Sequence, residues 1–405
     1  MKTEQDDKTA EVVTSRQRVQ IALRHKEPDR IPVDFLATPE VWDKLVTHFQ
    51  SNVAQLESSE FFSPEREAVL QQLEIDCRLI SYDMFCAPPE SVLKAGSTID
   101  WWCSLARSTP NRMWRQLLPD GSSYDIWGHH TRSVANPTSH YEEYISWPLR
   151  TAVSVEDLKS YSWPTPDWWD FSCLPESIRK MDPNGKRSLR FRAGTVFENA
   201  WQLRGMEEFL TDMAMTPQIP LYIMDRITDV IVENVRQVLV LAGDDIDTVY
   251  FYDDIGAQNG LLISKNMWRR LIKPFHQRIV EIARQAGKLV MYHTDGAIRS
   301  IIPELIDMGV DILDPIQPTA KDMIPENLKA EFGDRLSFHG GVDIVRTLPL
   351  GTPVDVRSEV TQRARTMGIG GGYILSSSHH IQSDTPLENV LAMYETELRY
   401  PGIIE

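Results

Sequence analysis

The stretch Leu289-Val-Met-Tyr-His-Thr-Asp-Gly296 decides the predicted fold. It begins with a short apolar run, which is typical of a buried strand, and Gly296 marks the turn after it. Residues two apart on a strand point to the same side, so His293 and Asp295 should project together from the strand's end. Because α/β enzymes keep their chemistry at the carboxyl ends of parallel strands, the motif indicates a functional site. The alternative is a structural histidine and an aspartate that caps the helix predicted over residues 298–308.

The alternation of strand and helix recurs along the chain and predicts a parallel sheet. Eight such units predict a closed (β/α)8 TIM barrel, and a doubly wound open sheet is the alternative. The predicted strands cover residues 30–35, 77–81, 189–197, 248–252, 288–292, 312–316, 335–338 and 372–376. The predicted helices include residues 15–25, 39–49, 206–213, 220–241, 265–285 and 387–398. No GxGxxG or P-loop motif is present, so no bound nucleotide is expected.

A segment of different composition interrupts this alternation between the second and third predicted strands. Residues from about 88 to 186 are rich in Trp, Pro and Tyr, as in Trp163-Pro-Thr-Pro-Asp-Trp-Trp169. We predict one barrel domain over residues 15–405 with this stretch as an insertion, preceded by a flexible N-terminal segment, residues 1–14. The aromatic side chains either wall the pocket or fill a small core of their own.

Composition and charge exclude several classes of protein. The chain has 405 residues, of which 42% are hydrophobic and 25% charged, as in ordinary globular proteins. A net charge of −16 argues against nucleic acid and anionic membranes as partners. The four cysteines form no CxxC pair, which argues against a disulfide scaffold or a thiolate zinc site. With no apolar signal segment at the start and no stretch long enough to span a bilayer, we expect a cytoplasmic protein.

Polar residues gather at the predicted strand ends, which converge on one mouth in a barrel. His293, Asp295 and His379 form a set of two histidines and one carboxylate, the pattern of a catalytic metal site with an open coordination position. Such a set suits Zn, Fe(II), Mn or Ni, and the metal would polarise a substrate oxygen or lower the pKa of a bound water or thiol. Alternatively, His379 acts as a general acid without metal, or His380 is the inward-facing residue instead.

The remaining strand-end residues are candidates for acid/base chemistry and substrate binding. Asp253 or Asp254 is expected to act as acid/base or to hold the substrate, while the other caps the next helix. Gln317 would orient a polar group, and His339 would orient Asp343 or face the pocket. The predicted substrate-binding residues are Asp34, Asp76, Arg78, Gln258, Gln317, His339 and Asp343.

Several stretches in combination resemble the uroporphyrinogen decarboxylase superfamily. The most specific is His-His-Ile-Gln-Ser-Asp-Thr-Pro-Leu-Glu-Asn at residues 379–389, and the others are residues 16–33, 253–262, 292–296, 309–317 and 339–343. The resemblance runs from about residue 15 to residue 394 and implies a (β/α)8 barrel. It also implies either the decarboxylase activity or the transfer of methyl groups between corrinoid proteins, methylated substrates and thiols.

Two departures from the family pattern shape the expected chemistry. Family methyltransferases bind zinc through a His-x-Cys pair and a later Cys, and the resemblance places His293, Asp295 and His379 at these positions. Nitrogen and oxygen ligands would bind zinc less tightly than thiolates and leave it more electrophilic. The Arg-Gln-x-Gly-Arg stretch with which the decarboxylase binds its polycarboxylate substrate is replaced by Phe35-Leu-Ala-Thr-Pro-Glu40, which lacks bidentate clamps. His379 does match the decarboxylase's late active-site histidine.

We therefore expect a methyltransferase-like metalloenzyme acting on a small polar organic substrate, with zinc as the metal that the resemblance favours. No Asp-x-His-x-x-Gly corrinoid motif is present, so any corrinoid would come on a separate partner protein. The resemblance also suggests a homodimer. A metal-independent decarboxylase or lyase, in which His379 and a strand-end Asp stabilise a protonated intermediate, is the first alternative. A non-catalytic binding protein is the second.

Overall fold

A seven-stranded parallel sheet forms the centre of the protein, in the order β1-β7-β8-β11-β12-β13-β14. The computed structural model describes residues 13–50, 63–102, 113–136, 140–396 and 398. All six neighbouring strand pairs of this sheet run parallel, as the strand and helix alternation predicts. The strands are β1 (Cys77–Ser81), β7 (Ser188–Gly194), β8 (Ile246–Tyr252), β11 (Leu289–His293), β12 (Ile312–Ile316), β13 (Ser337–Val342) and β14 (Tyr373–Ser377).

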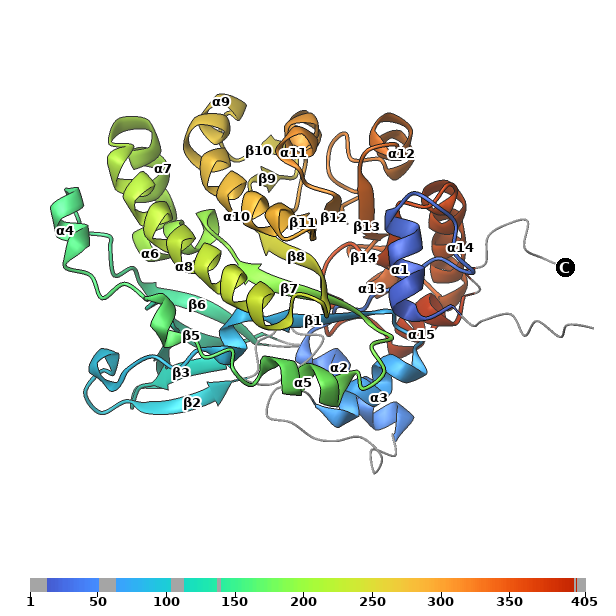
Figure 1. Ribbon diagram of the computed structural model, residues 1–405, viewed down its shortest axis with the longest axis horizontal. Coiled ribbons are helices and arrows are strands. Elements are labelled where there is room, and N and C mark those ends of the chain that lie inside the picture. The colour runs from blue at the N-terminus through green and yellow to red at the C-terminus, as the bar shows by residue number, and fades with distance from the viewer. Residues whose placement is uncertain (1–12, 51–62, 103–112, 137–139, 397, 399–405) are drawn as a thin grey trace, which may run out of the picture.

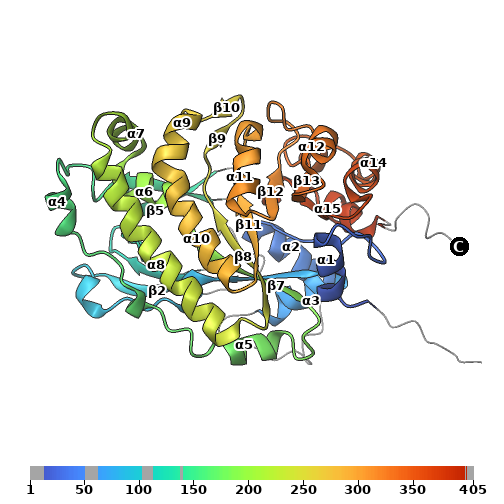
Figure 2. The same ribbon diagram turned by 45° about the horizontal axis from the view of Figure 1, so that its top comes forward.

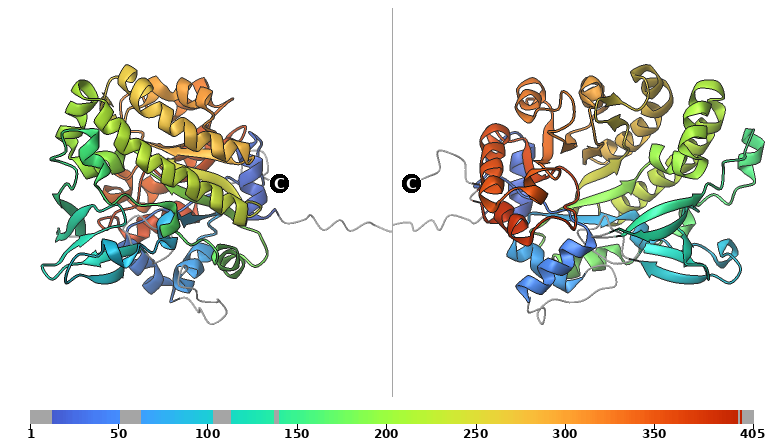
Figure 3. Two further views of the ribbon diagram at one scale, coloured as in Figure 1. Left: turned by 60° about the vertical axis from the view of Figure 1, so that its left-hand side comes forward. Right: turned by 180° about the vertical axis from the view of Figure 1, so that it is seen from behind.

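The chain segment before helix α2 joins the two edges of this sheet. Val33 forms a parallel bridge to Leu375 of β14, and its carbonyl accepts from the Asp76 N–H directly before β1 at 3.0 Å. The predicted first strand, residues 30–35, is therefore an isolated bridge rather than a strand. Pro32 has no N–H for the ladder, and the N–H of Val33 donates to the Asp76 carboxylate at 2.9 Å. The sheet is curled like a TIM barrel, with this segment in place of a regular eighth strand (Figure 3).

Helices cover the outer face of the curled sheet (Figure 2). The predicted helix over residues 265–285 contains a π-helical turn, η4 (Trp268–Ile272). Most of the predicted flexible segment 1–14 lies outside the described residues, but Thr14 already caps α1. The main helices are α1 (Ser15–Leu23), α2 (Pro39–Phe49), α3 (Pro64–Gln72), α6 (Phe197–Arg204), α7 (Met206–Met215), α8 (Gln218–Ala242), α9 (Lys265–Met267), α10 (Lys273–Gln285), α11 (Ile302–Met308), α12 (Pro325–Phe332), α13 (Thr347–Leu350), α14 (Pro353–Arg363) and α15 (Leu387–Glu395). Among the described residues, no helix has the length and apolarity needed to cross a bilayer.

The chain between β1 and β7 forms a second, antiparallel sheet of five strands. This sheet lies beside one end of the parallel sheet, on the side away from α1 (Figure 1). Trp168 and Trp169 are buried in the main hydrophobic core, so these two aromatic residues do not fill a separate core. The elements of this region are β2 (Thr98–Trp102), β3 (Met113–Leu117), β4 (Ser122–Tyr124), β5 (His130–Ala135), β6 (His140–Ser146), α4 (Val155–Lys159) and α5 (Leu174–Met181).

Helix α1 packs on the N-terminal ends of the parallel strands. A small apolar cluster fills the interior there and consists of Val19, Leu23, Cys77, Met291, Ile312 and Ile374. Asp76 lies at this end, where its carboxylate pairs with Arg18 at 2.7 Å and Arg30 at 2.8 Å. Arg78 is ion-paired with Glu67 of the covering helix α3 at 2.6 Å. The prediction that Asp76 and Arg78 lie at the mouth is therefore wrong, because Asp76 precedes its strand and Arg78 contacts the helical layer.

Two glycines bring the loops after β8 and β11 into backbone contact. Gly296 has a φ of +88°, and a Cβ built there would lie 2.7–2.8 Å from backbone atoms of Gly256 and Ala257. The N–H of Ala297 donates to the carbonyl of Ala257 at 2.9 Å. This close approach holds Asp295, which directly precedes Gly296, in its turn.

We predict that Gly296→Ala lowers the free energy of unfolding by about 2–4 kcal/mol, because it combines backbone strain with a steric clash. Gly287→Ala is the matched control. Its φ is +70°, but no atom lies within 4 Å of an added Cβ, so only the strain of about 1 kcal/mol should remain. Urea unfolding of both variants measures the difference, and equal losses would rule out the close approach as the reason for Gly296.

Candidate metal centre and active site

A cavity of about 310 Å³ opens at the carboxyl ends of the parallel strands. The region between β1 and β7 contributes one wall through Asp125, Ile126, Trp127, His129 and Tyr144. The barrel contributes Tyr82, Asp83, Arg192, Thr195, Glu198, Asn199, Gln202, Tyr250, Tyr252, Asp254, His293, His379 and His380. A larger cavity of about 600 Å³ lies beside the start of α1 and the end of α5. Among the described residues, the group of side chains that could hold a metal ion lies at the mouth formed by the carboxyl ends of the strands.

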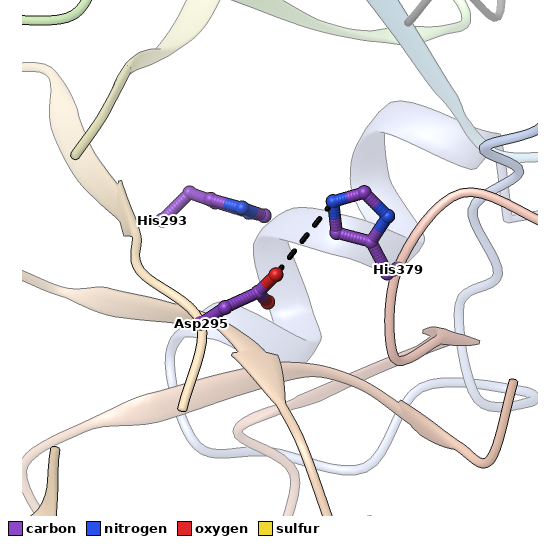
Figure 4. A group of neighbouring side chains, drawn as sticks. All are labelled: His293, Asp295 and His379. Carbon is purple, nitrogen blue, oxygen red and sulfur yellow. Dashed lines mark ion pairs between the residues drawn. The ribbon is translucent and has the colours of Figure 1, made fainter. Parts of the chain in front are cut away.

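His293, Asp295 and His379 come together at this mouth, as the sequence predicts. Each offers a ligand atom, and the three atoms lie within 4.8 Å of one another. His293 ends β11, Asp295 follows two residues later, and His379 lies in the loop after β14. Figure 4 shows the Asp295 carboxylate and the His379 ring pointing toward each other, with Oδ2 3.7 Å from Nε2. His380 also lines the cavity, but His379 is the histidine in this group.

The Asp295 carboxylate is incompletely hydrogen-bonded. Its Oδ1 is buried and has no hydrogen-bond partner in the structure. Burial raises the pKa of Asp295, although the charges of His293 and His379 oppose the rise. A buried carboxylate oxygen without a partner is costly, so the Asp295 carboxylate is suited to bind a cation.

The strand register places Asp314 of β12 beside His293. The two residues are direct partners in the parallel pairing of β11 and β12, and His293 Nδ1 lies 2.8 Å from Asp314 Oδ2. This contact leaves Nε2 on the cavity side, 3.9 Å from Asp254 Oδ1. Burial alone would lower the pKa of His293, but the charge and hydrogen bond of Asp314, with Asp295 and Asp254, raise it to about 10.

Beneath the cavity, buried charged groups continue from Asp314 across the barrel interior. His339 Nδ1 lies 2.6 Å from Asp314 Oδ1, and its Nε2 lies 2.8 Å from Asp34 Oδ2. Arg190 of β7 also pairs with Asp34. Burial would raise the pKa of Asp34 and Asp314, but the neighbouring cations outweigh it and lower both values. Neither Asp34 nor His339 lines the cavity, so their predicted contact with substrate is not supported.

The two adjacent aspartates after β8 have different surroundings. Asp253 is fully buried, accepts from the N–H of Glu198 at 2.9 Å and pairs with His276 at 2.6 Å. It caps the start of α6 and does not line the cavity, so the structure does not support the predicted catalytic role of Asp253. Asp254 lines the cavity, and its Oδ1 accepts from the N–H of Asp295 at 2.8 Å. Of this pair, Asp254 is the candidate acid/base.

Three predicted substrate-binding residues lie outside the cavity lining and hold loops instead. Gln317 Oε1 accepts from the N–H of Gly296 at 2.8 Å and so supports the turn after Asp295. The Gln258 side chain donates to the carbonyl of Thr319. Asp343 Oδ1 accepts from the N–H of Val345 at 2.7 Å.

Glu198 is a cavity residue that the sequence reasoning missed. Its Oε1 accepts from the N–H of Asp254 at 2.8 Å. Burial, with the charges of Asp254 and Asp253, raises the pKa of Glu198 to about 8, so its carboxyl group carries a proton at neutral pH. Its position directly after the predicted strand over residues 189–197 was the available signal.

Arg192 of β7 was missed as well. It is 7% exposed, donates to Ser81 Oγ at 2.8 Å and Asp83 Oδ2 at 3.1 Å, and lies over the Tyr252 ring. Arg190 and Arg192 stand two residues apart in an otherwise apolar strand, and this spacing indicates two charges on the interior face. The i, i+2 spacing that indicated His293 and Asp295 also applies to Arg190 and Arg192.

Comparisons with known proteins place the chain in a family. Over nearly its whole length the chain matches the fold of a methyltransferase from Methanosarcina mazei, with 94% of this chain and 97% of that one covered, a TM-score of 0.61 and 15% identity. Dispersin B covers 56% of this chain and 76% of its own at a TM-score of 0.33 and 10% identity, which is too low to indicate a shared fold. No curated protein sequence matches the chain. The family model of uroporphyrinogen decarboxylase (URO-D) matches residues 148–400. The chain is therefore a member of the uroporphyrinogen decarboxylase family.

Proposed function

We propose that this protein is a metalloenzyme of methyltransferase type that acts on a small polar organic molecule. His293, Asp295 and His379 hold one divalent metal in this proposal. The main support for this proposal is that three ligand atoms lie within 4.8 Å of one another at the mouth of the barrel. The cluster of groups with shifted pKa values in one cavity favours an enzyme over a non-catalytic binding protein.

The chemistry of these side chains fits a metal ion. Asp295 offers a carboxylate whose Oδ1 is buried without a partner, and His293 offers Nε2, whose proton a metal would displace, because its Nδ1 is bonded to Asp314. Three protein ligands leave a coordination position for substrate or water. Zinc is favoured by the family resemblance, and Fe(II), Mn and Ni also suit nitrogen and oxygen ligands. A metal bound here would supply Lewis-acid polarisation or lower the pKa of a coordinated water or thiol.

Methyl transfer is supported by the resemblance in sequence and by the shared fold with a protein named as a methyltransferase. A separate corrinoid protein would supply or accept the methyl group, since the chain has no Asp-x-His-x-x-Gly motif of its own. One wall of the cavity comes from the region between β1 and β7. This wall would keep water from the reacting groups. A homodimer and a cytoplasmic location remain predictions from the sequence.

The other cavity residues have roles that follow from their protonation and position. Glu198, whose pKa is raised by burial and by Asp254 and Asp253 in the metal-free protein, is the proton donor to a leaving heteroatom in this proposal. Asp254 lines the cavity and is the base or hydrogen-bond acceptor toward substrate in this proposal. Arg192 presents a buried guanidinium group to any anionic part of the substrate.

Metal-independent decarboxylation is the second candidate, and the presence of Glu198 and Arg192 in one cavity favours it. Arg192 would bind a carboxylate of the substrate. After CO₂ leaves, Glu198 or His379 would deliver a proton to the carbon atom. The metal content of the purified protein separates the two candidates.

We predict that the protein, purified without chelator or metal-affinity resin and then loaded with Zn²⁺, retains about one metal ion per chain by elemental mass spectrometry. His293→Ala and His379→Ala should reduce this to near zero, because two remaining ligands do not hold zinc firmly. His380→Ala is the matched control, since His380 lines the same cavity beside His379. It should retain the metal.

A protein that binds no Zn, Mn, Ni or Fe(II) would contradict the metal site and favour the decarboxylase alternative. Loss of metal in His380→Ala together with retention of metal in His379→Ala would show that the choice of His379 is wrong.

Glu198 gives a prediction for the pH dependence of stability in the metal-free protein. A folded pKa of about 8 lies above the unfolded value of about 4.3. The folded state therefore keeps a proton that the unfolded state has lost, and stability falls as pH rises through this interval by at most about 1.4 kcal/mol per pH unit. Glu198→Gln removes this dependence, so the variant should gain stability relative to the wild type between pH 5 and about pH 8.

Urea unfolding at several pH values measures this gain. Glu176→Gln is the control, because the pKa of exposed Glu176 is lowered by Lys180 rather than raised. A constant difference between Glu198→Gln and the wild type across this range would show that Glu198 is ionised in the folded protein.

A further inference from the structure

A chain of buried charged side chains runs under the proposed metal site and ends on one of its ligands. Arg190, Asp34, His339 and Asp314 come from β7, the segment before α2, β13 and β12. All four are at most 6% exposed. None of them lines the cavity, so they act on the site through their contacts rather than by touching a substrate.

The hydrogen-bond partners of these four side chains indicate which of their atoms carry protons. His339 faces a carboxylate oxygen at each ring nitrogen, Asp314 Oδ1 at 2.6 Å and Asp34 Oδ2 at 2.8 Å. An ionised carboxylate only accepts hydrogen bonds, so with Asp34 and Asp314 both ionised these two short contacts place a proton on each nitrogen of His339, and the Arg190 N–H at 3.4 Å from Nε2 is the longer contact. The two cations Arg190 and His339 then balance the two anions Asp34 and Asp314, so these four side chains together carry no net charge.

This balance leaves Asp314 Oδ2 for His293. The oxygen lies 2.8 Å from His293 Nδ1 and accepts its proton. The Tyr250 ring packs edge to face against the His293 ring, with centroids 6.2 Å apart, and limits its rotation. His293 therefore presents Nε2, and not Nδ1, to the cavity.

We propose that Asp314, held by the doubly protonated His339, is a positioning residue that fixes the proton of His293 on Nδ1 and keeps Nε2 for the metal. The inference rests on the proposed metal site. It adds that metal affinity depends on a residue that neither binds the metal nor lines the cavity. Partners that orient a ligating histidine typically change metal affinity 10- to 100-fold when they are removed.

Asp314→Asn is the direct test. The two imidazole N–H groups face different oxygens of Asp314, and in the amide one of these oxygens becomes an NH2 donor, so His339 and His293 can no longer both donate to it. We expect zinc affinity, measured by competition with a chelating dye, to fall 10- to 100-fold. Asp311→Asn is the matched control, because Asp311 directly precedes the same strand but pairs with Arg284 and accepts from the N–H of Val290 at 2.8 Å, a bond that the Asn oxygen can still accept. It should bind zinc as the wild type does.

A second readout does not depend on metal. In protein labelled with ¹⁵N-histidine, the Nδ1–H signal of His293, assigned by its loss in His293→Gln, should be visible with and without zinc. It should vanish or shift strongly in Asp314→Asn and persist in Asp311→Asn. If Asp314→Asn does not fold, His339→Gln replaces it and should weaken zinc binding severalfold through the loss of the contact to Asp314.

The outcomes separate this inference from the proposed function. If the wild type binds zinc and Asp314→Asn binds it within twofold of the wild type, the positioning role is overturned. If the wild type binds no zinc, the metal site fails, and the Nδ1–H signal decides alone. Loss of that signal in Asp314→Asn supports the positioning of His293, and its persistence overturns it.

Discussion

The contact between His293 and Asp314 is the interaction on which the site depends. It forms because the parallel register of β11 and β12 makes these two residues direct partners on the interior face of the sheet. Charged groups inside a barrel are costly unless each is paired. The interior meets this requirement with alternating signs from Arg190 through Asp34, His339 and Asp314. An apolar cluster under α1 lies at the N-terminal end, and the cavity lies at the carboxyl end.

The mouth differs from this interior because its polar groups are incompletely paired. Asp295 Oδ1 has no hydrogen-bond partner, and His379 is partly exposed and 3.7 Å from the Asp295 carboxylate. Asp253, one residue from the cavity-lining Asp254, is by contrast fully buried and fully used as a cap and ion-pair partner. Satisfied groups of this kind hold structure, whereas the unsatisfied groups around Asp295 are available for a ligand.

The sequence predicts the parallel sheet and the His293, Asp295 and His379 group because both depend on local patterns. Strand periodicity and an i, i+2 spacing are visible without a structure, and the family motif at residues 379–389 supplies the distant member. Asp76 and Arg78 were misplaced because proximity to a strand does not say which end or which face a residue occupies. The pKa of Glu198 and the role of Asp314 could not be predicted, since each arises from partners on other strands. The first predicted strand is only an isolated bridge, because Pro32 has no N–H to donate and the N–H of Val33 donates to the Asp76 side chain instead of to a backbone partner.

X-ray absorption spectroscopy of the zinc-loaded protein measures which atoms surround the metal. The described cysteines, Cys77, Cys86 and Cys173, lie outside the His293, Asp295 and His379 group. Zinc bound by His293, Asp295 and His379 should show a first shell of nitrogen and oxygen at about 2.0–2.2 Å, with imidazole scattering from two histidines and no sulfur. A sulfur shell at about 2.3 Å would contradict it, as would a spectrum unchanged by the loss of His293.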